Sequence, residues 1–481
     1  MYEGIRDMTT IKEGSRTVPV LGEYDVAVCG GGPAGCAAAI GAARHGARTL
    51  LMEKDGYLGG ATVSQLVAVI LSTNGVDFQG IWHEYARKLK ACSAIQDLEL
   101  KQRGETHQCL SSAVDPERVK FVWDELCTEA GAEILHHAHG STLVLKNGAA
   151  AGVIAETRAG RRAILARRVI DATGDGYVAA QAGAGYDCGD GIHPWAMALT
   201  KVFRLAGVKR PEDWPDPEVQ KKLADELEAA VERGEYTAPV VTEQKRLLAY
   251  TGGHGAWALT PLRGETVSVI SRVLKIDPLD PFEFSRAERE GREQARQAAD
   301  FYCRYVPGFE NAYLLDTSAQ IGIRSSRRLH GIATVTDEDA FELKRFTDQI
   351  ARSSWDIDVW PADSYTRPAV ERGREYYQER MGRVAAGEYF GIRYGCLVAD
   401  DIDNLMMAGR CVSAGHRAEA SLRIQQTCMA TGEAAGVGAA LSLEQDISPR
   451  RLDPAHVADR LEEDRDVEPA FDVISELPVA E

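Results

Sequence analysis

A glycine-rich turn between two short apolar runs, close to the N-terminus, constrains this chain more than any other stretch. Residues 24–53 read YDVAVCGGGPAGCAAAIGAARHGARTLLME. The small and β-branched residues at 25–29 and 49–52 are typical of parallel strands buried on both faces. The alanine-rich segment between them predicts a helix that begins at Pro33 and ends just before Gly46, because proline is tolerated in a first helical turn. The stretch therefore predicts a strand–turn–helix–strand unit.

The turn itself matches G-x-G-x-x-G, a pattern that binds the pyrophosphate of a dinucleotide. Gly30 allows the tight turn, Gly32 lets the backbone approach the pyrophosphate, and Gly35 lets the helix pack closely on the strand. Glu53, at the end of the second strand, can accept hydrogen bonds from ribose hydroxyls and repels a 2′-phosphate. A structural glycine turn without a nucleotide is the alternative. The flanking strands and the acid at the expected spacing favour an ADP-containing cofactor.

Four further segments favour a flavin over a nicotinamide. A second glycine pair stands at 59–60, and the amphipathic stretch after Asp115 predicts a helix. A strand at 168–171 leads into the turn ATGDG. Another strand at 404–407 is followed by Gly-Arg and then by an alanine- and glycine-rich helix at 424–441.

The order of these motifs resembles that of a known family. GGGPAG, GGAT, IDATGD, an IG-R--RR segment, AGRC-SA and a closing AAG stand at 30–35, 59–62, 170–175, 321–328, 408–414 and 434–436. Over roughly residues 18–443 the chain resembles the FAD-dependent oxidoreductases of the glutathione-reductase-like two-domain flavoprotein superfamily. The resemblance implies FAD and an α/β fold, with a Rossmann-like FAD-binding domain (parallel sheet, three-layer) and an inserted α+β substrate or cap domain. It implies no substrate, because such folds carry many chemistries.

The motifs and the resemblance together predict the residues that bind the cofactor. They are Gly30, Gly32, Pro33, Ala34, Gly35, Glu53, Lys54, Gly59, Gly60, Ala61, Thr62, Ala172, Thr173, Gly174, Asp175, Gly409, Arg410, Gln425, Gln426 and Thr427. The resemblance also implies that the N-terminus of the last long helix points at the N1–C2=O edge of the flavin. A helix N-terminus is positive there and would stabilise the negative charge of a reduced flavin.

The same pattern predicts how the chain is divided. We expect the FAD-binding domain at 18–190, a return to it at 313–335, and its last part at 391–443. The substrate or cap domain is expected at 191–312 and 336–390, and an acidic C-terminal helix and tail at 444–481.

Composition excludes several classes of partner. The net charge of −17 argues against nucleic acid and against an anionic membrane surface. No signal peptide and no apolar run of membrane length is found, so we expect a cytoplasmic protein. The ten cysteines never form C-x-x-C, which argues against a dithiol relay or a zinc ribbon, and we expect no metal site. Ala61 and Thr62 stand where succinate dehydrogenase-like relatives carry a flavin-linking histidine, although a covalent link stays open.

The segment 411–421, CVSAGHRAEAS, is expected to form a loop where function is often placed. His416 is the first choice for a catalytic base or proton donor, because histidine titrates near neutrality, and Arg417 and Glu419 lie beside it. Arg423 is a candidate clamp for flavin or substrate, with a surface arginine at a helix start as the alternative.

A second arginine group stands at 321–328, which we expect to be a helix start. Arg324 and Arg328 would then share a face and could capture a carboxylate on the substrate, or else form salt bridges between domains. Weaker candidates to line the cavity are His193, Trp195, His254 and Tyr394.

These features predict an enzyme that moves a hydride between a small polar substrate, bearing a carboxylate or hydroxyl, and FAD N5. No second G-x-G-x-x-G unit is found, so the electron donor or acceptor is expected to be substrate, oxygen, quinone or another protein. A flavin monooxygenase and a flavin-bearing RNA-modifying protein are the alternatives, and a homodimer stays open.

Overall fold

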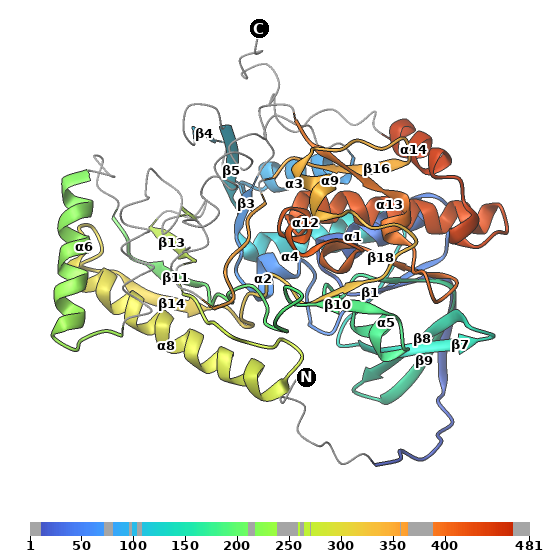
Figure 1. Ribbon diagram of the computed structural model, residues 1–481, viewed down its shortest axis with the longest axis horizontal. Coiled ribbons are helices and arrows are strands. Elements are labelled where there is room, and N and C mark those ends of the chain that lie inside the picture. The colour runs from blue at the N-terminus through green and yellow to red at the C-terminus, as the bar shows by residue number, and fades with distance from the viewer. Residues whose placement is uncertain are drawn as a thin grey trace, which may run out of the picture.

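The computed structural model describes residues 11–71, 80–95, 99–102, 108–209, 217–237, 258–259, 264–269, 271–355, 357–363 and 388–464 (Figure 1). Its centre is a seven-stranded sheet with strand order β6-β2-β1-β9-β8-β7, in which β18 also pairs with β9. These strands are β1 (Val20–Cys29), β2 (Thr49–Met52), β6 (Glu133–Leu135), β7 (His139–Lys146), β8 (Ala149–Thr157), β9 (Gly160–Asp171) and β18 (Leu405–Met407).

The long strand β9 takes part in two kinds of pairing. Its first half runs antiparallel to β8, whereas its last residues run parallel to β18, and β1 lies parallel along its other edge. The parallel strands β6, β2, β1, β9 and β18 therefore form one sheet with the antiparallel hairpins β7–β8–β9. This mixed α/β, Rossmann-like arrangement confirms the predicted fold class.

Both faces of β1 are buried over its last four residues, 26–29, within the stretch for which the sequence predicts it. Val26 and Val28 belong to the hydrophobic cluster on the helical face, whereas Ala27 and Cys29 belong to the cluster on the opposite face. The helical face is covered by α1 (Pro33–Arg44), α3 (Ile81–Ala91), α4 (Pro116–Glu129) and α13 (Gln425–Glu444), and the short α5 (Tyr177–Gln181) packs on β7 (Figure 1).

Helices α1 and α13 pack in direct backbone contact. A side chain at Gly432 would overlap the backbone oxygen of Ala34, and one at Gly436 would overlap that of Ala38. The earlier glycine on α13 meets the earlier residue on α1, and the later glycine meets the later residue. The two helices therefore run in the same direction. Their N-termini therefore point to the same edge of the sheet, where the parallel strands end.

The second lobe holds a four-stranded antiparallel sheet in the order β12-β13-β11-β14. It consists of β11 (Phe203–Ala206), β12 (Ala258–Leu259), β13 (Glu265–Ser268) and β14 (Tyr313–Thr317), with α6 (Pro217–Glu232) and α8 (Pro281–Tyr305) beside it. Strands and helices therefore both occur here, in keeping with the α+β character expected of the inserted domain. β14 joins this sheet although it falls in the segment expected to return to the FAD domain, and the domain boundaries stay predictions.

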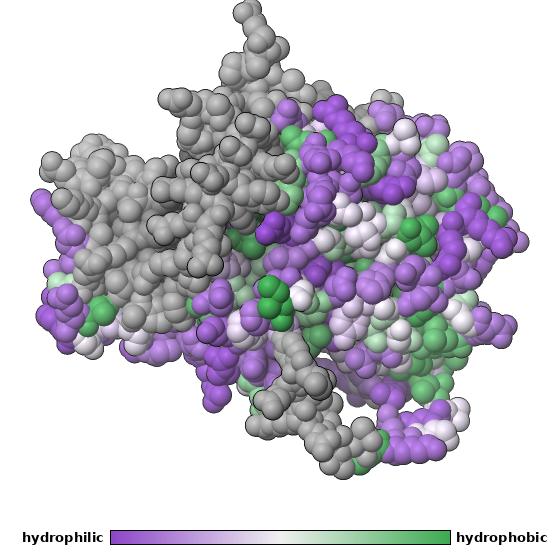
Figure 2. All heavy atoms as spheres, viewed as in Figure 1, coloured by the Kyte–Doolittle hydropathy of each residue, from purple (hydrophilic) through white to green (hydrophobic). Residues whose placement is uncertain are grey.

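Shorter elements complete the described chain. They are the strands β3 (Val69–Leu71), β4 (Glu99–Gln102), β5 (Gln108–Ala113), β10 (Tyr186–Cys188), β15 (Arg327–Leu329), β16 (Gln349–Ser353) and β17 (Phe390–Arg393), and the helices α2 (Ala61–Ser64), α9 (Asp337–Phe341), α12 (His416–Leu422), α14 (Pro454–Glu463), η1 (Tyr394–Leu397), η2 (Gly409–Cys411) and η3 (Pro449–Arg451). Figure 2 shows a mostly hydrophilic surface over the described residues in this view. No helix in the described ranges has the length and apolarity to cross a membrane.

Two local expectations are wrong. Residues 321–328 do not begin a helix, because Gly322 pairs with Thr200 and the strand β15 pairs with β10. Residues 411–421 are not a loop throughout, because α12 begins at His416. Asp337 caps that helix by accepting hydrogen bonds from the backbone N–H groups of Arg417 and Ala418, at 2.9 and 3.0 Å. Both local structures depend on contacts with residues that are distant in the sequence.

The helix contact gives a first prediction. Gly432→Ala should gain about 1 kcal/mol from helix propensity, but the new methyl group would force α1 and α13 apart. Overpacking of this kind costs about 1–3 kcal/mol, so we expect a net loss in the free energy of unfolding measured with urea. The exposed Glu444→Ala, in the last turn of α13, should change it by less than about 0.5 kcal/mol. Equal stability of Gly432→Ala and wild type would contradict this packing.

Candidate active site

Two glycine turns lie against each other at the end of the parallel strands. The N–H of Gly59 donates to the backbone oxygen of Gly31 at 2.8 Å. Gly60 has a positive φ of 49°, and its backbone lies close to Gly32. A Cβ at Gly35 would overlap the backbone oxygen of Gly30, so this position packs the helix against the turn. The structure thus brings the predicted segments 30–35 and 59–62 together.

Gly32 differs from its neighbours because the space beside it is open. It has the extended φ of −74°, and a Cβ there would meet only the Cα of Gly60, at 3.8 Å. Gly32 also directly precedes α1, whose first-turn N–H groups have no partner inside the helix. This is the geometry that lets a pyrophosphate approach the backbone.

Glu53 lies at the end of β2 and is buried. Its two carboxylate oxygens accept hydrogen bonds from the N–H groups of Gly31, at 2.6 Å, and of Asp55, at 2.8 Å. Burial raises the pKa of Glu53, and these two donors partly oppose the rise. Each oxygen has a second lone pair, so the carboxylate can still accept bonds from a ribose. The neighbouring Lys54 instead pairs with Asp55 at the surface, at 3.2 Å.

The turn after β9 is held by two aspartates. Asp171 is buried and accepts hydrogen bonds from Thr173 and from the N–H of Ala179. Asp175 pairs with Arg410 at 2.7 Å and accepts a bond from Ser326. Burial alone would raise the pKa of Asp175, but Arg410 and Ser326 hold it below its usual value. This pair fixes the predicted segments 172–175 and 409–410 against each other.

The first turn of α13 lies beside α2. Thr62 donates to the side-chain oxygen of Gln425 at 2.7 Å, and the amide of Gln425 donates to the backbone oxygen of Val67 at 3.2 Å. Gln426 and Thr427 are buried, at 0% and 1% exposure, yet both amide atoms of Gln426 and the hydroxyl of Thr427 lack a hydrogen-bond partner in the described part of the chain. Buried polar groups are normally paired, so these atoms indicate a site for a ligand.

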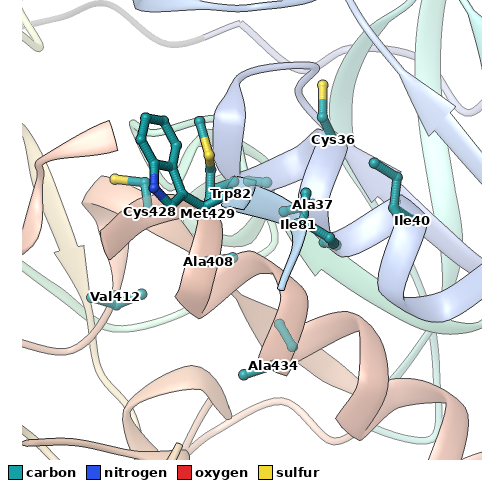
Figure 3. Close-up of a cluster of buried hydrophobic side chains, with 14 of the residues drawn as sticks. Cys36, Ala37, Ile40, Ile81, Trp82, Ala408, Val412, Cys428, Met429 and Ala434 are labelled. Atoms are coloured by element: carbon teal, nitrogen blue, oxygen red, sulfur yellow. The ribbon is translucent and has the colours of Figure 1, made fainter. Parts of the chain in front are cut away.

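Apolar side chains of α1, α3 and α13 pack together next to this region. Figure 3 shows Trp82, from the start of α3, with Cys428 and Met429 of α13, and Cys36, Ala37 and Ile40 along α1. Gly409 also lies against α1 and α13, because its N–H donates to Thr431 at 3.1 Å and a Cβ there would meet Ala34. The predicted glycine, Gly409, is therefore next to the N-terminus of α1.

A buried ion pair lies between β15 and α12. Arg328 contacts the Oε2 of Glu419 at 3.1 Å, with side chains only 6% and 1% exposed. The Oε1 of Glu419 and the Nδ1 of His416 are buried without a hydrogen-bond partner among the described residues. His416 and Glu419 are three residues apart on α12, so they lie on one face of the helix.

Burial shifts the pKa values of both titratable groups on this face of α12, Glu419 and His416. Burial raises the pKa of Glu419 to about 7, although Arg328 and Arg410 oppose the rise. Burial and then Arg328 lower the pKa of His416 to about 4, so the expectation that it titrates near neutrality is wrong. Glu419 is the group that changes charge near neutral pH.

The remaining predicted site residues lie in three places. Arg423 ends α12 directly before α13 and contacts Asp358 at 3.1 Å. Arg324 donates to Thr200 and to the backbone oxygen of Ala198 in the second lobe. Arg417 is exposed, with its guanidinium 5.7 Å from the ring centre of Phe341.

Tyr394 lies away from this site, whereas His193 lies close to the Arg328–Glu419 pair, because Arg328 donates to the backbone oxygen of Gly189 at 3.0 Å and a Cβ at Gly189 would overlap the backbone oxygen of His193. Tyr394 is buried beside Gly438, about 20 Å along α13 from the first turn, and donates to the backbone oxygen of Pro449 at 3.1 Å. His193 and Trp195 stack on each other at 4.2 Å. His254 lies outside the described residues. Sequence reasoning did not single out Ser326, which fills a variable position of the segment 321–328, or Asp358, which belongs to no motif. Both act through distant partners.

Sequence similarity places the chain in a known family. A family described as FAD dependent oxidoreductase matches residues 25–461. The chain belongs to this FAD-dependent oxidoreductase family. FAD is accordingly its cofactor, and the open backbone at Gly32 and the unpaired polar atoms of Gln426 and Thr427 fit such a ligand. The narrower placement among glutathione-reductase-like proteins stays a prediction, as do the roles of the individual residues.

Individual relatives match smaller parts of the chain. Digeranylgeranylglycerophospholipid reductase 2 of Methanopyrus kandleri is 30% identical over 193 residues, which are 40% of this chain and 47% of that protein. Dihydrolipoyl dehydrogenase of Trypanosoma brucei brucei is 49% identical over 49 residues, 10% of each chain. Both matches span less than half of those proteins. A geranylgeranyl bacteriochlorophyll reductase-like structure from Thermoplasma acidophilum has a TM-score of 0.41 at 13% identity, covering 94% of this chain and 90% of that one.

The two glycines of the turn give a matched pair of variants. Gly32→Ala should leave the stability of the FAD-free protein within about 0.5 kcal/mol of wild type, because no clash arises. It should weaken FAD binding at least about tenfold, since the methyl group occupies the approach to the pyrophosphate. Gly35→Ala should instead lower the free energy of unfolding by about 1–3 kcal/mol. Titration of FAD followed by absorbance, together with urea unfolding, separates the effects. Unchanged FAD affinity in Gly32→Ala would count against this placement.

Glu419 gives a prediction about pH. Its pKa is raised from 4.5 to about 7 in the folded protein, so the folded state holds a proton that the unfolded state has lost. Stability should therefore fall as the pH rises from about 4.5 to about 7. In Glu419→Gln this part of the slope should be absent, whereas the exposed Glu444→Gln should keep it. Urea unfolding at about pH 5 and about pH 8 measures the difference. The prediction fails if the free energy of unfolding falls by the same amount between these two pH values in Glu419→Gln and in wild type.

Proposed function

We propose that this chain transfers a hydride between a carbon atom of a small polar substrate and the N5 atom of FAD. Glu419 takes or gives the accompanying proton. FAD supplies the two-electron chemistry when bound, and the protein supplies position and electrostatics. The sequence favours His416 for the proton, but with a pKa of about 4 this histidine is too weak a base for efficient proton transfer near neutral pH.

The observation that carries the proposal is the free oxygen of Glu419. Arg328 holds Oε2 at 3.1 Å, which fixes the orientation of the carboxyl group, while Oε1 is buried without a hydrogen-bond partner in the described part of the protein. A pKa of about 7 lets the group exist in both protonation states under ordinary conditions. This combination of burial, orientation and matched pKa is what a general acid or base requires.

The proton and the hydride leave the substrate together in the oxidative direction. The Glu419 carboxylate accepts the O–H or N–H proton of the substrate, while the hydride of the C–H bond on the same substrate would pass to FAD when it is bound. The reductive direction reverses both transfers. Neutral His416, three residues before Glu419 on α12, can accept a hydrogen bond through Nδ1 and so orient the substrate.

The N-terminal end of α13 supports the cofactor half of the proposal. The positive end of this 20-residue helix, with the nearby Arg423, would stabilise negative charge on a reduced flavin. Gln426 and Thr427 would supply hydrogen bonds to the flavin, since their polar atoms are buried and unpaired within the described residues. The negative charge of the reduced flavin would then be stabilised without a positively charged histidine.

The test uses the FAD-bound protein under anaerobic conditions. Hydroxy acids, amines and sugar acids are screened for bleaching of the visible flavin absorbance. With an active substrate, the rate of bleaching should rise with pH through about pH 7, because the Glu419 carboxylate must be free to accept the proton. Glu419→Gln should slow bleaching by about 10²–10⁴-fold and remove this pH dependence, with unchanged FAD content.

A matched control separates this role from a loss of structure. The exposed Glu444→Gln should keep both the rate and the pH profile. A Glu419→Gln enzyme with a normal pH profile would overturn the role of Glu419. A product that carries oxygen from O₂ would instead identify a monooxygenase, and salt-sensitive retention of bulk RNA on a filter would favour an RNA-modifying protein.

A further inference from the structure

The hairpin of β16 and β17 packs its inner face on the helix that carries Glu419. Ser353 of β16 lies opposite Phe390 of β17, and both side chains are buried, at 0% and 1% exposure. The hydroxyl of Ser353 lies 2.9 Å from that of Ser421 in α12, two residues after Glu419. The other face of the hairpin points away from α12, because successive residues of a strand alternate between its faces.

This outer face gathers two arginines on one tyrosine ring. Arg352 lies opposite Gly391, next to the buried pair and therefore on the outer face. The guanidinium carbons of Arg345 and Arg352 lie 4.3 and 5.3 Å from the ring centre of Tyr389. Arg345 comes from the loop before β16, where the backbone oxygen of Lys344 accepts a hydrogen bond from Gly391 at 2.8 Å. Both distances are within the range of cation–π contact.

A second aromatic ring beside it carries two further cations. The Nζ of Lys344 and the guanidinium carbon of Arg393 lie 5.2 and 5.3 Å from the ring centre of Phe346. Each of these cations has a carboxylate partner at 2.9 Å, which is Asp339 for Lys344 and Asp348 for Arg393. These two pairs therefore contribute little net charge to the surface.

Arg345 and Arg352 lack such a carboxylate. In the ranges that the structure describes, neither forms an ion pair or a side-chain hydrogen bond, and Glu342 and Glu388 do not pair with them although they lie near in sequence. The surface around Tyr389 therefore keeps two uncompensated positive charges. Charges more than about 8 Å away are largely screened at physiological salt, so a partner here meets these two charges rather than the net −17 of the chain.

The composition and exposure of this surface favour a protein partner. Arginine and tyrosine are enriched at the centres of protein interfaces, and stacked arginines lose less side-chain freedom on binding. Arg345 is exposed, so a single small anion would gain little there, because isolated exposed ion pairs contribute little. A nucleic acid extends over many phosphates and would also meet the negative remainder of the protein. A compact partner with several carboxylates fits best.

We propose that the outer face of the β16–β17 hairpin, centred on Arg345, Arg352 and Tyr389, is the docking surface for a protein that presents a carboxylate-rich segment. The partner's carboxylates bind the two guanidinium groups, which the Tyr389 ring holds side by side. A partner bound there lies over α12 with one hairpin between them. The inference is independent of the proposed hydride transfer, since it needs neither substrate nor turnover.

The test is a titration of a fluorescein-labelled poly-glutamate peptide with the FAD-bound protein, followed by fluorescence anisotropy. We expect saturable binding that weakens as salt is added. The double variant Arg345→Gln/Arg352→Gln should raise the dissociation constant of poly-glutamate at least about tenfold, since it removes two charged hydrogen-bond donors. Arg345→Lys/Arg352→Lys keeps both charges but loses the planar forks, so it should fall between the double glutamine variant and wild type.

A matched control removes the same number of positive charges elsewhere. Arg48 also stacks on a tyrosine, at 4.7 Å from the ring centre of Tyr24, but it pairs with Glu133 at 3.3 Å. Arg48 and Arg296 are 62% and 66% exposed. Arg48→Gln/Arg296→Gln should therefore leave the affinity for poly-glutamate unchanged, although its net charge equals that of the other double glutamine variant.

Folding of the variants is checked by FAD content and urea unfolding. Arg352 is only partly exposed, so if its variant fails to fold, the exposed Arg345→Gln alone carries the test.

Four results would overturn the inference. The first two are an absence of saturable poly-glutamate binding and an unchanged affinity in Arg345→Gln/Arg352→Gln. The third is tighter binding of a single-stranded DNA oligonucleotide than of poly-glutamate through the same arginines, which would identify a nucleic-acid surface. The fourth is self-association of the protein in sedimentation experiments that this double variant abolishes, which would identify a second copy of the chain as the occupant.

Discussion

The backbone contact between α1 and α13 is the constraint on which the rest of the site depends. Glycines at 432 and 436 let the two helices approach until their backbones touch, and the order of contacts makes them parallel. Two positive helix ends therefore lie at one edge of the sheet, beside the ends of the parallel strands. Bulkier residues at these positions would separate the helices and move the two ends apart.

Around this edge the protein keeps charged groups in pairs. Arg410 neutralises Asp175, Arg328 neutralises Glu419, and Arg423 contacts Asp358. Burying an isolated charge is costly, so each pair permits a charge where a bound flavin or substrate would need it. Glu419 differs from Asp175 and Asp358 because its second oxygen, Oε1, is buried without a hydrogen-bond partner in the described structure. This unpaired oxygen, rather than the residue type, distinguishes Glu419 as the group proposed to transfer the proton.

The sequence predicts the parts of the fold that depend on neighbouring residues. The turn at 30–35, the strands beside it, the helices α1, α4 and α13, and the strand that ends before Gly409 all follow from local periodicity and glycine spacing. The segment 321–328 looks helical by itself and is extended only because β10 pairs with its end. Likewise, α12 depends on capping by Asp337, about 80 residues away in the chain.

The chemical properties of the site were harder to predict than its location. The sequence places His416 and Glu419 in the same short segment, and a histidine is the ordinary choice for proton transfer near neutral pH. Burial changes the outcome, since it disfavours the charged form of both groups and moves their pKa values in opposite directions. The stacking of Arg345 and Arg352 on Tyr389 is equally invisible in sequence, because Tyr389 belongs to a separate segment of the chain.

The backbone hydrogen bonds of the segment 320–322 also affect how the two lobes can move relative to each other. This short segment is joined by backbone hydrogen bonds to α2 on one side and to Thr200 on the other. A hinge that opened the lobes here would have to break those bonds and expose their groups, which is costly. Any opening between the lobes at this place would therefore leave the Gln320 N–H and the Ser64 carbonyl to be satisfied by water.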